Sequence, residues 1–104
     1  MGYITDILDE EYQRLRALSL KYESEITSLP RGSISIKKRG RNKYLYLAYR
    51  EKGKIRFDYI GPEDSVNARM VIEKIERRKE YEDKLKQVKQ NLAEIERAVH
   101  GRKR

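Results

Sequence analysis

The chain of 104 residues contains no cysteine and no tryptophan, and only one histidine. The lack of cysteine excludes disulfide bonds, thiolate zinc sites and cysteine nucleophiles. A single histidine also excludes a metal site built from several imidazoles. No apolar run is long enough to span a membrane, and the first residues lack the pattern of a signal peptide. We therefore expect a cytoplasmic protein that makes no membrane contact and binds no metal.

Apolar residues make up only 38% of the chain, whereas charged residues make up 40%. Such a composition favours a thin core with long, solvated helices over a thick, layered enzyme core. We expect a single α+β domain over residues 1–104, divided into a helix (1–29), a basic β-meander (30–61), a second helix (62–100) and a basic tail (101–104).

The net charge of +8 is spread unevenly along the chain. Residues 1–29 have a net charge of −3, residues 30–61 of +8, and residues 62–104 of +3. The middle segment alone holds ten basic and two acidic side chains. Positive charge concentrated on a small surface is typical of a protein that binds a polyanion.

The first segment repeats its apolar residues at helical spacing, and Pro30 is expected to end the helix because the residue before a proline avoids helical geometry. This stripe consists of Ile4, Leu8, Leu15, Leu18, Tyr22, Ile26 and Leu29. The last segment begins with Pro62, Glu63 and Asp64, which favour a helix start, and reaches His100. We expect the two helices to run antiparallel as a coiled-coil-like hairpin.

The second helix contains an a/d heptad seam of nearly three repeats. The seam residues are Tyr81, Leu85, Val88, Leu92, Ile95 and Val99. Packing against the first helix explains this seam as well as self-association does. The second helix is longer than the first by about ten residues, so we expect its tail to pair with a second copy and form a homodimer.

Residues 33–60 change to period two, with turn signals at 40–42 and 51–53, which predicts a three-stranded antiparallel sheet. A three-residue loop at 51–53 pairs Arg50 with Lys54 and puts Leu45, Leu47 and Tyr49 on one face with Ile55, Phe57 and Tyr59. A two- or four-residue loop around Arg41-Asn42 adds Ile34 and Ile36 to this apolar face, which we expect the two helices to cover. The opposite face then holds Lys37, Arg39, Tyr44, Tyr46, Arg50, Lys54 and Arg56, with Asp58 as the lone acid. A two-residue loop at Lys52-Gly53 mixes apolar with charged residues, and we prefer the first register because it separates them.

A sheet face with cations and tyrosines suits nucleic acid, because Lys and Arg neutralise phosphates and aromatic rings stack on bases. We expect binding to double-stranded DNA, with RNA as an alternative. The competing explanation is that exposed strands carry Lys and Arg to prevent their edges from pairing with strands of other molecules. The candidate contacts are Lys37, Lys38, Arg39, Arg41, Lys43, Tyr44, Tyr46, Arg50, Lys54 and Arg56.

The stretch from Gly32-Ser33-Ile34 through Lys37-Lys38-Arg39 and Tyr44-Leu45-Tyr46-Leu47 to Tyr59-Ile60-Gly61 resembles a pattern in small mobile-element-associated bacterial and archaeal proteins. It is similar to the N-terminal segments of some transposases and to the three-stranded arm-binding domains of tyrosine recombinases. Those domains place the sheet in the DNA major groove. The resemblance implies that role for Lys37, Arg39, Tyr44, Tyr46, Arg50 and Arg56.

Nothing in the sequence points to catalysis. The acidic clusters alternate with Lys and Arg at helical spacing, which is typical of solvated ion-pair faces. His100 is expected in the last turn of a helix, where its charge is favourable. No glycine loop for phosphate and no metal-ligand pattern is present. We expect a non-enzymatic protein without a cofactor or a small-molecule substrate; the alternative to nucleic-acid binding is a coiled-coil scaffold for a protein partner.

Overall fold

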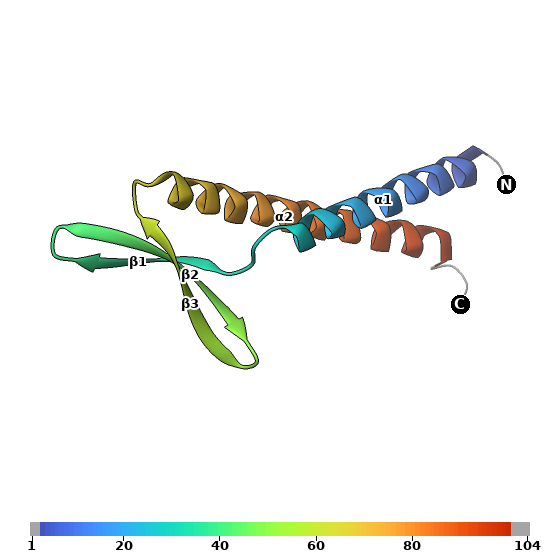
Figure 1. Cartoon of the computed structure of the whole chain (residues 1–104). Helices are drawn as coiled ribbons and strands as arrows, with labels where there is room; N and C mark the ends of the chain where they lie inside the picture. Colours follow the sequence, from blue (N-terminus) through green and yellow to red (C-terminus); the bar gives the residue numbers. More distant parts are fainter. Residues whose placement is uncertain (1–2, 101–104) are drawn as a thin grey trace. The chain divides into compact units, whose positions relative to one another are not determined.

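The computed structural model describes residues 3–100, without the side chains of residues 3–5 and 100; the predicted basic tail at 101–104 lies outside the described residues. Two helices flank a three-stranded antiparallel sheet, so the α+β class is confirmed (Figure 1). The elements are α1 (Tyr3–Ser28), β1 (Ser33–Arg39), β2 (Asn42–Glu51), β3 (Lys54–Pro62) and α2 (Val66–His100).

The chain divides into two compact units. The helical unit contains α1 and the part of α2 from Glu80 onward, and the sheet unit contains Leu29–Lys79. The sheet unit therefore includes all three strands and the first turns of α2. No helix among the described residues has both the length and the apolar character needed to cross a membrane.

The helical unit is an antiparallel hairpin, as predicted. The Tyr22 and Tyr81 rings lie 5.8 Å apart between centroids, near the end of α1 and well before the end of α2. Leu8, near the start of α1, lines a hollow together with Ile95 and Val99, near the end of α2. The start of α1 therefore lies beside the end of α2 (Figure 1).

Helix α2 begins at Val66, so the predicted start at Pro62 is wrong. Pro62 is the last residue of β3 and is paired with Tyr44. The Ser65 hydroxyl oxygen accepts a hydrogen bond from the backbone N–H of Ala68 at 3.1 Å, which is the geometry of an N-cap. The serine cap and the sheet pairing of Pro62 together set the start of the helix.

The residues by which α2 is longer than α1 lie at the N-terminal end of α2, because the part of α2 before Glu80 belongs to the sheet unit. Ala68 and Ile75 from these turns are buried, and so is Leu45 of β2, which is 0% exposed. Arg78 stands where the heptad pattern calls for an apolar residue. Its Nη1 donates a hydrogen bond to the carbonyl oxygen of Leu29 at 2.7 Å, just after α1 ends.

The strands lie in the order β1-β2-β3, and the register of the first pair agrees with the prediction. Ile34 pairs with Leu47 and Ile36 with Leu45 across a two-residue turn at Gly40-Arg41. The predicted register of the second pair is wrong, because Glu51 and not Arg50 pairs with Lys54.

The turn chemistry explains the register of β2 and β3. Lys52 and Gly53 have φ angles of 52° and 79°, and positive φ at both central residues is the mark of a type I′ hairpin. This two-residue turn matches the right-handed twist of the strands. The strands therefore adopt the register that the turn requires, although apolar and charged side chains then share a face. Every side chain of β3 up to Tyr59 consequently lies on the face opposite to the predicted one.

A β-bulge corrects the register near the end of β3. Tyr46 pairs with Tyr59, and Leu45 pairs with Gly61, so Ile60 is the additional residue. Ile60 and Gly61 are the only residues of β3 that are not exposed. The bulge thus allows the end of β3 to join the core while Phe57 and Tyr59 remain outside.

Candidate nucleic-acid interface

The side chains of the sheet divide into two faces, which follow from the strand register. We call the first the aromatic face: Ser33, Ser35, Lys37, Arg39, Asn42, Tyr44, Tyr46, Ala48, Arg50, Ile55, Phe57 and Tyr59. We call the second the core face: Ile34, Ile36, Lys38, Lys43, Leu45, Leu47, Tyr49, Glu51, Lys54, Arg56, Asp58 and Gly61.

The aromatic face is open to solvent along β3. Ile55, Phe57 and Tyr59 are 57%, 48% and 56% exposed, respectively. Their position explains why they are uncovered: the buried side chains of the sheet unit include Leu45, which lies on the other face. An uncovered face with this much apolar area marks a surface for a ligand or partner.

The rings on this face contact one another and a lysine. Tyr59 lies 5.4 Å from Tyr46 and 6.3 Å from Tyr44 between ring centroids. The Lys37 ammonium lies 4.7 Å from the Tyr46 centroid and 4.4 Å from that of Phe57. These cation–π contacts fix a positive charge within the cluster of rings.

The charges on the two faces have different partners. On the core face, Arg56 forms an ion pair with Glu51 at 3.4 Å, and the Tyr49 hydroxyl donates to Asp58 Oδ1 at 3.3 Å. Desolvation of the phenol, and secondarily this hydrogen bond, raise the pKa of Tyr49 above its usual value. The strand residues of the aromatic face include no acid, and two acids that follow β3, Glu63 and Asp64, line a hollow with Asn42 and Tyr44.

The guanidinium groups of Arg39 and Arg50 make no hydrogen bond and no ion pair within the part of the chain that the structure describes. Both therefore keep their full set of donors for a ligand. With Lys37 they give the aromatic face three cations, which no carboxylate on that face offsets.

The structure brings only half of the predicted nucleic-acid contacts together. Lys37, Arg39, Tyr44, Tyr46 and Arg50 share the aromatic face, as predicted. Arg41 lies in the turn between β1 and β2. Lys38, Lys43, Lys54 and Arg56 lie on the core face, so the expected grouping of Lys54 and Arg56 with Tyr44 and Tyr46 is wrong, for the reason of register given above.

Sequence reasoning missed Ile55, Phe57 and Tyr59, which it assigned to the covered face. The signal that identifies them is the Lys52-Gly53 turn, since a two-residue hairpin fixes which residues of β3 face Arg50 and Ala48. Their apolar character favoured the covered face, because such side chains are usually buried.

The predicted dimerisation residues lie in the helical unit, and several of them face α1. Val88 is buried, and Tyr81 contacts Tyr22. Ile95 and Val99 line a hollow with Leu8, so the tail of α2 is not the unpaired segment that the difference in helix length suggested. Homodimerisation through Tyr81, Leu85, Val88, Leu92, Ile95 and Val99 stays a prediction, to be checked by sedimentation.

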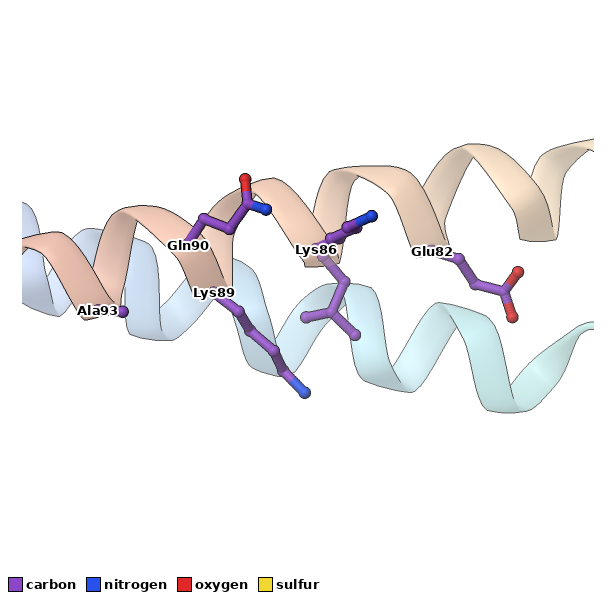
Figure 2. A pocket seen from close by; sticks show the side chains of 6 residues that line it. Glu82, Lys86, Lys89, Gln90 and Ala93 are labelled. Carbon is purple, nitrogen blue, oxygen red and sulfur yellow. The ribbon is translucent and has the colours of Figure 1, made fainter.

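A second hollow lies along α2, and Figure 2 shows that its labelled side chains all come from this one helix. Its lining residues are Glu82, Leu85, Lys86, Lys89, Gln90 and Ala93. Charges of both signs surround little more than Leu85 and Ala93, so the groove favours no particular ligand. No group of three or more potential metal-binding side chains occurs among the described residues.

The fold defines an α+β protein with an antiparallel helical hairpin and a basic three-stranded sheet, one face of which carries four aromatic side chains and is exposed along β3. Residues 7–69 match the family described as Domain of unknown function (DUF6788), and because the match covers more than half of the chain, the protein belongs to that family. The match includes the whole sheet and the first residues of α2. Comparisons with curated proteins and with solved structures gave no match.

Proposed function

We propose that this protein binds nucleic acid through the aromatic face of its sheet, as a non-catalytic binding protein of the cytoplasm. The observation that carries the proposal is that three cations and four aromatic rings share one face of the sheet, whose strand residues include no acid. Phosphates are neutralised by Lys and Arg with release of counterions, and rings contact bases or sugars. The resemblance to mobile-element-associated proteins described in the sequence analysis is consistent with this proposal.

The proposed contacts divide into two kinds. Lys37, Arg39 and Arg50 bind phosphates, because a guanidinium presents planar donors that suit phosphate oxygens and an ammonium acts as a point charge. Tyr44, Tyr46, Phe57 and Tyr59 supply apolar contact area. This division predicts that charge substitutions change the salt dependence of binding and that ring substitutions leave it unchanged.

The test is fluorescence anisotropy of labelled duplex and single-stranded oligonucleotides over a salt series. Three phosphate contacts give a slope of about −2 to −3 for log K against log salt. Arg39→Ala and Arg50→Ala should each reduce the slope by nearly one, whereas Lys54→Ala, on the core face, should leave it almost unchanged. A salt-independent affinity, or an equal loss in Lys54→Ala, contradicts the proposed interface.

A further inference from the structure

The aromatic face contains a hollow of about 340 Å³, lined by Arg39, Tyr44, Tyr46 and Tyr59. Three of its four lining side chains are aromatic rings, and rings make favourable contacts with another planar, apolar group. The hollow therefore suits one planar base, and it lies entirely within the sheet unit.

The orientation of the rings favours a stacked ligand. The Tyr59 plane is tilted by 62° from Tyr46 and by 50° from Tyr44. Neither pair is therefore stacked face to face. Tyr59 is also more than half exposed, which leaves a ring face free for another planar group.

The positive charge at the hollow suits the sugar-phosphate backbone of a nucleic acid. Arg39 lines it with a guanidinium that has no partner among the described residues, and Lys37 lies on the neighbouring ring of Tyr46. A base bound among the tyrosines places its own phosphate within the reach of the long Arg39 side chain. The hollow thus offers an apolar, aromatic floor with positive charge at its side.

We propose that this hollow binds an unpaired base of a single-stranded nucleic acid, with the base stacked on Tyr59 and the adjoining phosphate held by Arg39. A base inside a duplex is covered by its neighbours and reaches such a hollow only after unstacking. The inference rests on the proposed function and narrows it from nucleic acid in general to single strands. Single-stranded DNA and RNA share the recognised chemistry.

The first experiment separates base stacking from phosphate binding by competition against a labelled oligo(dT) bound to the full chain. The competitors are oligo(dT), oligo(rU), an abasic deoxyribose-phosphate strand with the same number of phosphates, and the dT·dA duplex. Stacking contributes about tenfold per base, so oligo(dT) should compete at least tenfold better than the abasic strand. The duplex should also compete less well than oligo(dT) at the same salt concentration.

The second experiment assigns the effect to Tyr59. Tyr59→Leu keeps an apolar side chain but removes the ring, and should lower the affinity for oligo(dT) about tenfold. Tyr59→Phe keeps the ring and should bind as the unmodified chain does. Tyr49→Leu, which removes a ring from the core face, is the matched control and should leave the affinity unchanged; circular dichroism checks that each variant is folded.

A complementary readout uses the absence of tryptophan from the chain. Tyr59→Trp introduces a single reporter, whose fluorescence a stacked base quenches and an abasic strand does not. Equal competition by oligo(dT) and the abasic strand, or stronger competition by the duplex, overturns the single-strand proposal and leaves phosphate binding in place. Failure of every competitor to bind overturns both proposals, and the relative strength of oligo(rU) and oligo(dT) distinguishes RNA from DNA.

Discussion

Both acidic side chains of the sheet, Glu51 and Asp58, lie on its core face, and each has a partner there, whereas the aromatic face has three cations and no acid. The same strands thus produce one face whose polar groups are paired within the protein and another whose charges have no counterpart on that face. Folding uses the first face, as the complete burial of Leu45 indicates. The second face is exposed along β3, and it is the face that we propose for nucleic acid.

This contrast predicts that substitutions on the core face change stability, and that substitutions on the aromatic face change binding. The strongest test is Leu45→Ala, which removes the fully buried side chain of β2 and should cost about 2–5 kcal/mol in the free energy of unfolding. Urea unfolding followed by circular dichroism measures the effect. Ile55→Ala, at an exposed position of β3, is the control and should cost less than about 1 kcal/mol.

The second prediction concerns the turn that decides which residues of β3 share a face with Arg50. Gly53 has a φ of 79°, so Gly53→Ala should cost about 1–2 kcal/mol through backbone strain. Lys52→Asn should instead increase the free energy of unfolding, because asparagine before glycine favours the type I′ turn. Thermal unfolding of both variants checks the pair, and a Gly53→Ala variant as stable as the parent chain would argue against this register.

A smaller effect is expected at the ion pair between Arg56 and Glu51 on the core face. Both side chains are about half exposed, so Arg56→Ala should cost no more than about 1 kcal/mol, and less at high salt. Its affinity for oligonucleotides should stay close to that of the parent chain. A loss of binding as large as that of Arg50→Ala would show that the two faces are not functionally distinct.

The smallest effect should come from the hydrogen bond between Tyr49 and Asp58. Because the pKa of Tyr49 is raised in the folded chain, its contribution to stability is present below the ordinary tyrosine pKa and is lost as the pH rises through the folded value. Denaturation at neutral and strongly alkaline pH measures this contribution. Tyr49→Phe should make the alkaline loss of stability shallower, and an unchanged alkaline loss would contradict this contribution.

Prediction from the sequence succeeded for the order and type of the elements, and it failed for the start of α2 and for the pairing of β2 with β3. The helical stripes, the period-two strands and the pairing of Ile34 and Ile36 with Leu47 and Leu45 all follow from local pattern. The pairing of β2 with β3 was wrong because apolar segregation was given more weight than the Lys52-Gly53 turn. That choice assumed that Phe57 and Tyr59 must be covered, which they are not.

The tail of α2 also shows that a pattern along the sequence does not identify the packing partner of an element. The sequence shows that α2 is longer than α1, but it does not say at which end the surplus lies. The structure places the surplus before Glu80, in the sheet unit, where Ala68 and Ile75 are buried. Spacing along one helix specifies a face for packing, whereas the partner of that face depends on the path of the rest of the chain.

The sequence by itself determined the helix–sheet–helix order, the concentration of positive charge in the middle segment, and the absence of thiol chemistry. These depend on composition and on local periodicity. Only the tertiary structure decided which cations and rings share a face, because a shift of one residue in strand register moves every side chain of β3 to the other side of the sheet. That shift replaced Lys54 and Arg56 with Ile55, Phe57 and Tyr59, and so made the basic face an aromatic one.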